Sequence, residues 1–199
     1  MIKYIFFDMD GVLTTHTTGS YTTCKFFADI LDCDFDELFA YIRQYDSDID
    51  SGALSLENLW RKAFEKYNKE YKNEYMYESF LSTPIDSKML EIVYELKKNY
   101  KVGIITDNSI ERAEAIFDKN GFRNIFDTLV VSEEAKATKK STEIFKLTAT
   151  RANVECSECV FIDNNSNNVK VAQEAGFKGI YFNDQERDYD RLFKDILGE

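Results

Sequence analysis

The sequence predicts an α/β protein with a doubly wound parallel sheet and a small helical domain inserted after the first strand. Short apolar runs alternate with helical patterns over most of the 199 residues, as is typical of such sheets. The stretch from Thr14 to about Pro84 interrupts this alternation and carries only helical spacing. The chain is 44% apolar and 15% aromatic, which is sufficient for a sizeable core.

Five segments are predicted to be the buried parallel strands. Each is rich in β-branched or aromatic residues and is bounded by polar ones. They are 3–7 (KYIFF), 100–106 (YKVGIIT), 127–132 (DTLVVS), 159–163 (CVFID) and 178–182 (KGIYF).

Helices are predicted between these strands. Segment 86–100 places Met89, Ile92, Val93 and Leu96 on one stripe. Segment 108–121 is predicted to begin with Asn108 as its N-cap, with Glu111 three residues later, and to end at Gly121. Segment 167–176 likewise ends at a glycine, Gly176.

The inserted stretch has four segments with helical spacing, namely 21–34, 34–46, 54–71 and 75–81. Its apolar side chains are predicted to form its own core rather than a ligand site; they are Phe35, Leu38, Phe39 and Ile42 on the second helix and Leu59, Trp60, Phe64 and Tyr67 on the third. The expected domains are 1–13 with 86–199 for the α/β core and 14–85 for the insertion.

The charge balance narrows the expected partners. The chain has 25 basic and 36 acidic side chains, a net charge of −11, which opposes binding to nucleic acid and to anionic membranes. The sequence has no run suited to crossing a bilayer, and the opening MIKYIFFD meets an acidic residue too early for a secretory signal. A cytoplasmic protein is therefore expected.

The cysteines and the single histidine offer little chemistry. The four cysteines fit free thiols in a reducing compartment. Cys156 and Cys159 have Cys-x-x-Cys spacing but lead into an apolar strand, without the further ligands of a structural zinc site. His16 is expected in a solvated loop, so a Ser-His or Cys-His mechanism has little support.

Polar residues instead gather where three predicted strands end. These residues are Asp8 and Asp10 after the first strand, Thr106, Asp107 and Asn108 after the second, and Asp163, Asn164 and Asn165 after the fourth. Since ligands of open parallel sheets bind at the carboxyl ends of the strands, these side chains are expected to converge on one site. In an extended strand, positions 8 and 10 share a face.

With these motifs the chain resembles the haloacid dehalogenase superfamily over essentially its whole length. DMDGV at 8–12 matches the first motif of that family, Thr106 the second, and FIDNNSNNV at 161–169 the fourth. Ungapped placement of SEEAKATKKSTEIF on the third motif puts Ser132 on its serine and Lys139 on its lysine, with Lys140 as the alternative lysine. The insertion falls where capped family members carry their cap domain.

The resemblance implies a Rossmann-like core and a capped phosphatase similar to phosphoglycolate and sugar phosphatases. Asp8 would be the nucleophile that forms an aspartyl-phosphate, and Asp10 the general acid and then the base. Mg²⁺ would be held by the carboxylates of Asp8 and Asp163 and the main-chain carbonyl of Asp10, because Mg²⁺ needs only a few protein oxygens. Lys139 would supply fixed positive charge at the phosphate.

The remaining implied phosphate contacts come from the second motif and the glycine. Thr106 would donate its hydroxyl, Asp107 and Asn108 would complete the phosphate-binding loop, and Gly11 would let the backbone pass close to the phosphate. Two positions depart from the family pattern: Asn164 replaces a frequent second acid, and Asp107 replaces a frequent asparagine. Magnesium is expected to bind more weakly for the first reason, and the Asp107 side chain to turn away for the second.

Three functions are consistent with these residues. Asp10 favours phosphoester chemistry, because family members that release halide or cleave phosphonates lack an acid there. A phosphatase for a small phosphorylated metabolite, working as a monomer or weak homodimer, is the main hypothesis. A sugar phosphomutase of the same superfamily and a catalytically weak phospho-aspartate signalling module are the alternatives.

Overall fold

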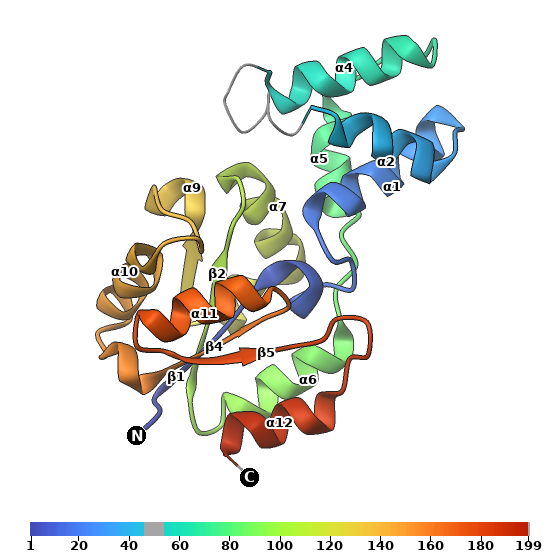
Figure 1. The fold of residues 1–199 in the computed structure, drawn as a ribbon. Coiled ribbons are helices and arrows are strands. Elements are labelled where there is room, and N and C mark those ends of the chain that lie inside the picture. The colour runs from blue at the N-terminus through green and yellow to red at the C-terminus, as the bar shows by residue number, and fades with distance from the viewer. Residues whose placement is uncertain (46–53, 199) are drawn as a thin grey trace. The chain divides into compact units, whose positions relative to one another are not determined.

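The computed structural model describes residues 1–45 and 54–198, and the chain divides into two compact units. The α/β unit comprises Met1–Thr17 and Pro84–Glu199, and the inserted unit comprises Thr18–Thr83 (Figure 1). Residues 46–53, which belong to the predicted insertion and include the end of its predicted second helix, lie outside the described residues.

The α/β unit contains the predicted parallel sheet. Its strands are β1 (Tyr4–Phe7), β2 (Lys101–Thr106), β3 (Thr128–Val131), β4 (Cys159–Asp163) and β5 (Lys178–Tyr181). All pairs are parallel, in the order β3-β2-β1-β4-β5. The order reverses between β1 and β4, which is where a doubly wound sheet opens a crevice for ligands.

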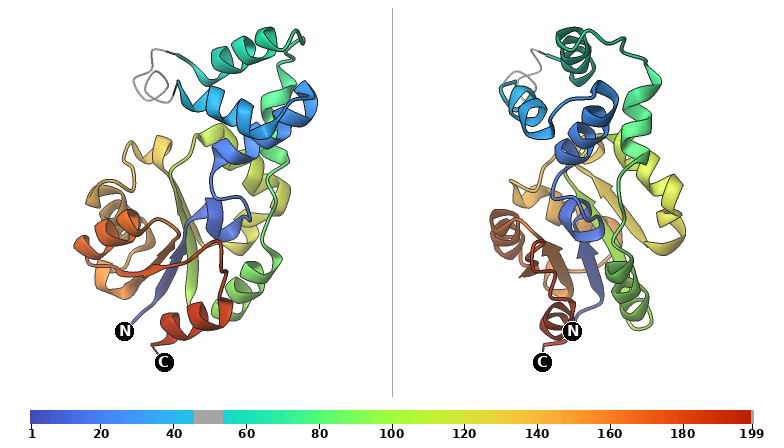
Figure 2. Two further views of the ribbon diagram at one scale, coloured as in Figure 1. Left: turned by 45° about the vertical axis from the view of Figure 1, so that its right-hand side comes forward. Right: turned by 90° about the vertical axis from the view of Figure 1, so that its right-hand side faces the viewer.

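Helices cover both faces of this sheet, as Figures 1 and 2 show. On one face α6 (Ser87–Leu96), α7 (Ile110–Asn120) and α12 (Tyr189–Leu197) pack against Ile5, Phe7 and Ile104. On the other face α10 (Thr142–Ala152) and α11 (Ser166–Glu174) pack against Phe6 and Phe161. Alternate residues of β1 therefore serve opposite cores, as the two-residue period of a strand requires. Short helices α8 (Phe122–Ile125) and α9 (Ser132–Ala135) complete the unit.

The inserted unit is helical throughout its described part. It contains α1 (Gly19–Leu31), α2 (Phe35–Arg43), α4 (Leu56–Lys66) and α5 (Glu74–Leu81). Side-chain oxygens of Thr18, Asp34 and Ser55 cap the first three of these helices. Phe27 packs against Trp60 and Phe64, with ring centroids 4.3 and 5.4 Å apart, and the aromatic residues predicted for this core cluster there.

One helix start differs from the prediction. Helix α7 is capped by Ser109, whose hydroxyl accepts from the Arg112 N–H, and not by Asn108. Asn108 does not cap the helix because its side chain is held by polar groups of other segments, described below. Gly121 closes the helix in a left-handed conformation, as predicted, and Gly176 follows α11 with a φ of 100°. Across the described ranges, none of the helices has the length and apolar character needed to cross a membrane.

Candidate active site

The candidate site lies at the switch point between β1 and β4. Strand β1 ends at Phe7 and β4 ends at Asp163. The Asp8 N–H still donates to the Ile162 carbonyl at 2.9 Å, so the strand ladder holds Asp8 at the end of the sheet. Asp10 follows within a single π-helical turn, Met9–Leu13, which opens with Asp10 and Gly11 in non-helical conformations. Both aspartates thus stand just beyond the strand.

Lys139 joins the aspartates that follow the two strands. Its Nζ lies 2.6 Å from Asp8 Oδ1 and 2.9 Å from Asp163 Oδ2. All three residues are buried, with 3% of Lys139, 6% of Asp8 and none of Asp163 exposed. Lys140, the alternative from the sequence, is exposed. The geometry therefore identifies Lys139 as the lysine of this site.

Burial shapes the ionisation of this triad. Desolvation raises the pKa of Asp8 to about 7; the neighbouring Lys139 opposes this rise, and the Asp163 and Asp10 carboxylates add to it. Burial also lowers the pKa of Lys139, but Asp8 and Asp163 outweigh that effect and hold the pKa above its ordinary value. The triad is thus an ammonium shared between two carboxylates, with negative charge in excess.

The carboxylate oxygens have unequal environments. Asp8 Oδ1 accepts from the Met9 N–H at 2.7 Å in addition to Lys139. Asp163 Oδ1 accepts from the Asn165 N–H at 2.7 Å, and its Oδ2 accepts from the Asn168 amide at 3.0 Å and from Lys139. Within the described part of the chain, no hydrogen bond engages Asp8 Oδ2. That oxygen is the one available to attack an electrophile or to bind a cation.

The donor set fits a hard divalent cation. It offers two carboxylates and a main-chain carbonyl, which matches the few protein oxygens that Mg²⁺ requires. Two buried carboxylates that share one ammonium would also favour a further cation. Over residues 1–45 and 54–198, no three His, Cys, Asp or Glu side chains are grouped as metal ligands, so a cation here would depend on the carbonyl and on water.

Asp10 has a separate set of partners. The Arg112 guanidinium, which is 5% exposed, binds both of its oxygens: NH2 lies 2.7 Å from Oδ1 and NH1 lies 2.8 Å from Oδ2. The Asn108 amide also donates to Oδ2 at 3.0 Å and to Thr106 Oγ1 at 3.0 Å. The predicted Asp10, Thr106 and Asn108 are therefore brought together, and Arg112 joins them without having been predicted.

Asp107 and Gly11 have local roles in building the site. The Asp107 carboxylate accepts from the main-chain N–H of Lys139 at 3.0 Å, which fixes the loop that carries the lysine. Gly11 has a φ of 81°, and a Cβ there would meet the Asn164 amide nitrogen at 2.2 Å. Asn164 in turn donates to Asp184 Oδ2 at 3.3 Å. Only glycine fits position 11, for conformational and steric reasons.

The other sequence candidates lie away from this chemistry. Cys156 and Cys159 are free thiols, and burial raises the pKa of Cys159 to about 12, so it is not a thiolate nucleophile at neutral pH.

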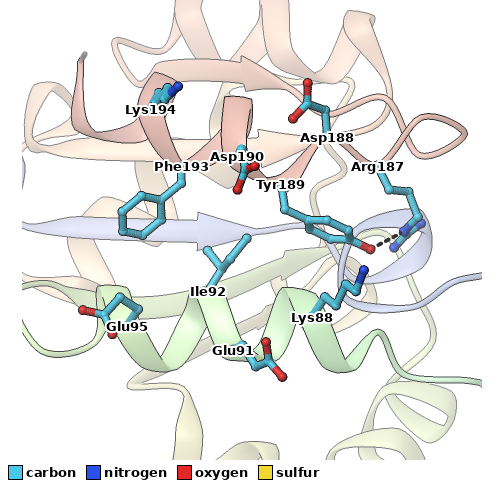
Figure 3. Close-up of a pocket in the computed structure, with 10 residues that line it drawn as sticks. All are labelled: Lys88, Glu91, Ile92, Glu95, Arg187, Asp188, Tyr189, Asp190, Phe193 and Lys194. Carbon is cyan, nitrogen blue, oxygen red and sulfur yellow. Dashed lines mark hydrogen bonds between the residues drawn. The ribbon is translucent and has the colours of Figure 1, made fainter.

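A groove of about 730 Å³ runs between α6 and α12 (Figure 3). It is lined by residues such as Ile92, Tyr189 and Phe193 and contains none of the predicted site residues.

Comparison with known proteins agrees with the fold. The family model described as haloacid dehalogenase-like hydrolase matches residues 2–176. A D-ribitol-5-phosphate phosphatase from Bacteroides thetaiotaomicron is 24% identical over 186 residues, covering 89% of this chain and 90% of that protein. A pyrimidine 5′-nucleotidase from Escherichia coli K12 is 28% identical over 155 residues, covering 71% of this chain and 68% of that protein.

Solved structures show the same fold. A family enzyme from Bacteroides thetaiotaomicron, in complex with magnesium and inorganic phosphate, superposes with a TM-score of 0.69 at 22% identity and covers 97% of this chain and all of that one. A phosphatase from Thermococcus onnurineus superposes with a TM-score of 0.66 at 20% identity, covering 99% of this chain and 98% of that one.

Proposed function

Because this chain belongs to the haloacid dehalogenase-like hydrolases, we propose that it is a magnesium-dependent phosphatase acting on a small phosphorylated metabolite. The observation that carries the proposal is the buried triad at the switch point, in which Lys139 Nζ bridges Asp8 and Asp163 at 2.6 and 2.9 Å. Such a triad combines a carboxylate nucleophile, a fixed positive charge and a cation ligand, the elements that phosphoryl transfer needs.

In this proposal Asp8 Oδ2 attacks phosphorus, and the bond from phosphorus to the leaving alcohol oxygen breaks. Asp10 gives that oxygen a proton, so the alcohol leaves neutral and an aspartyl-phosphate remains on Asp8. Water then attacks phosphorus and gives a proton to Asp10, the bond between phosphorus and Asp8 Oδ2 breaks, and inorganic phosphate leaves while Asp8 returns to a free carboxylate. Lys139 and the Thr106 hydroxyl stabilise the phosphoryl oxygens in both steps.

A magnesium ion bound to Asp8, Asp163 and the Asp10 carbonyl would supply further positive charge to the phosphoryl group. The geometry of the site supports this assignment, since two buried carboxylates, those of Asp8 and Asp163, share the single ammonium of Lys139. Asn164 leaves the ligand set with one acid fewer than a paired-acid motif would have.

The relatives narrow the substrate class to be tested first. One relative is named for D-ribitol 5-phosphate and covers nearly the whole chain, and another is named for pyrimidine 5′-nucleotides. A polyol or sugar phosphate is our first candidate, because the match to the ribitol phosphatase extends over more of both chains.

The test is release of inorganic phosphate by the full chain from D-ribitol 5-phosphate, uridine 5′-monophosphate and p-nitrophenyl phosphate, with magnesium and with excess EDTA. We expect turnover that requires magnesium and is lost in Asp8→Asn. Absence of turnover with every ester, or equal turnover in Asp8→Asn, would refute the proposal. Transfer of the phosphoryl group within a sugar phosphate, without phosphate release, would indicate the mutase alternative.

A further inference from the structure

We propose that Arg112 is a positioning residue for Asp10, an inference that rests on the phosphatase function because Asp10 is its general acid and base. The side chains of Arg112 and Asn108 together form a clamp around the Asp10 carboxylate, called here the Asp10 clamp. The acid motif of the first strand is thus completed by a side chain from α7, 102 residues further along the chain.

The Asp10 clamp fixes the plane of the carboxylate. Arg112 contacts both oxygens, at 2.7 and 2.8 Å, in the two-point arrangement that restricts rotation far more than a single contact does. Asn108 adds a third donor at 3.0 Å. A carboxylate offers about four acceptor positions, so about one remains, and this is the position that would carry the proton given to a leaving oxygen or taken from an attacking water.

Asn108 connects this clamp to the phosphate-binding group. Its side-chain oxygen accepts from Arg112 NH1 at 2.8 Å, while its amide donates to Asp10 and to Thr106 Oγ1. One continuous hydrogen-bond network therefore orients both the Asp10 carboxylate, which transfers the proton, and the Thr106 hydroxyl. Such second contacts typically determine how well a reactive group is aligned.

The position of Arg112 in its helix does not by itself favour a buried cation. It occupies the first turn of α7, where the positive end of the helix dipole disfavours a cation. The side chain is 5% exposed, and its Nε has no hydrogen-bond partner among the described residues. Since a buried ion pair is rarely better for stability than apolar residues of similar size, the geometry points to a role in orienting Asp10.

A double-mutant cycle tests this inference. Arg112→Met, Asp10→Asn and the double variant are compared with wild type for kcat and KM on p-nitrophenyl phosphate and D-ribitol 5-phosphate, with magnesium. The control is Arg123→Met, which replaces an exposed arginine in α8, the short helix that follows α7. We expect Arg112→Met to lower kcat by about 10- to 100-fold, as misplacement of a reacting group does, with KM changed by less than about 3-fold. In the Asp10→Asn background, Arg112→Met should lower kcat by less than about 3-fold.

Each outcome is decisive. A fall in kcat of the same factor in both backgrounds, or Arg112→Met turning over like Arg123→Met, would overturn the inference while leaving the phosphatase function intact. Wild type without turnover would instead refute the proposed function and the inference with it. If circular dichroism shows that Arg112→Met is unfolded, the cycle is run with Arg112→Lys, which keeps the charge but not the two-point geometry. The same changes in kcat are then expected. An equal fall in kcat in the wild-type and Asp10→Asn backgrounds would again overturn the inference.

Discussion

Replacement of Lys139 by methionine would remove the ammonium that pairs with the buried carboxylates of Asp8 and Asp163. In the metal-free protein the ammonium is the charge that compensates the buried carboxylates of Asp8 and Asp163, at 2.6 and 2.9 Å. Methionine fills a similar volume but leaves both buried carboxylates without their shared ammonium. Removing one partner of a buried ion pair costs about 3–5 kcal/mol.

This free energy predicts a large thermal shift. For a protein of this size each kcal/mol changes the melting temperature by about 2–4 °C, so the expected fall is roughly 6–20 °C in EDTA. Magnesium should restore part of the loss, because a divalent cation can take over the compensation. The increase in melting temperature on adding magnesium should therefore be larger in Lys139→Met than in wild type.

The assay is thermal unfolding by circular dichroism with EDTA or magnesium, together with phosphate release. The matched control is Lys140→Met, which removes an exposed lysine one residue away and should melt and turn over like wild type. Lys139→Met should also lose most of its turnover, because the fixed charge at the phosphoryl group is gone. Melting of Lys139→Met within about 2 °C of the control in EDTA, or equal stabilisation of both by magnesium, would refute this reasoning.

Two further predictions concern the active-site aspartates, and a third concerns Asp86, which caps helix α6 and pairs with Arg187 outside that site. Asp163→Ala should weaken magnesium activation of phosphate release by orders of magnitude while circular dichroism stays native, and unchanged magnesium dependence would exclude it as a ligand. Asp10→Asn should retain more turnover on p-nitrophenyl phosphate than on an alkyl phosphate, with a burst of nitrophenol followed by slow turnover, because proton transfer contributes about 10²- to 10⁴-fold for poor leaving groups; equal loss on both esters without a burst would contradict its role. Burial alone raises the pKa of Asp86, but hydrogen bonds from Tyr189, the Met89 N–H and Arg187 outweigh it, so the pKa lies below its ordinary value. The stability from this carboxylate is therefore present above about pH 4 and lost as the pH falls below that. Urea unfolding should show Asp86→Asn to be clearly less stable than wild type at pH 7 and closer to it at pH 3, and a gap that stays constant would argue against ionisation as the cause.

The strands and the two aspartates that follow them could be predicted because their signals are local. Asp8 and Asp163 each end an apolar run, and parallel strands bring such ends to one edge of a sheet. Lys139 could be placed only by its register within a motif, with Lys140 as the alternative. The structure distinguishes the two lysines because Lys139 is buried and Lys140 is exposed, a difference that cannot be read from two adjacent lysines in a sequence.

The role of Arg112 could not be predicted because it depends on Asp10, a partner 102 residues away in the sequence. An arginine in the first turn of an amphipathic helix is normally a solvated residue, and nothing near it in the sequence indicates that Asp10 lies against it. Tertiary contacts of its side chain also explain the error at Asn108. Its spacing to Glu111 fits a capping box, but Asp10, Thr106 and Arg112 use the side chain, and Ser109 takes over the cap.

The charges at the switch point indicate what a bound metal ion would compensate when a phosphate group enters the site. Asp8, Asp10 and Asp163 contribute three negative charges when ionised, and Lys139 and Arg112 contribute two positive ones. The resting site thus has one negative charge in excess, which burial resists by raising the pKa of Asp8. A phosphate dianion would bring the excess to three.

A bound magnesium ion would return that excess to a single negative charge, so the site with both metal and phosphate would have the same net charge as the resting site. An aspartate at position 164 would add one more negative charge beside the Asp184 carboxylate, which lies 3.3 Å from the Asn164 amide. The neutral amide donates to that carboxylate instead of repelling it. Asn164 is therefore compatible with the loop that Asp184 occupies, and in the proposed magnesium site Asp163 would act without a second acid at position 164.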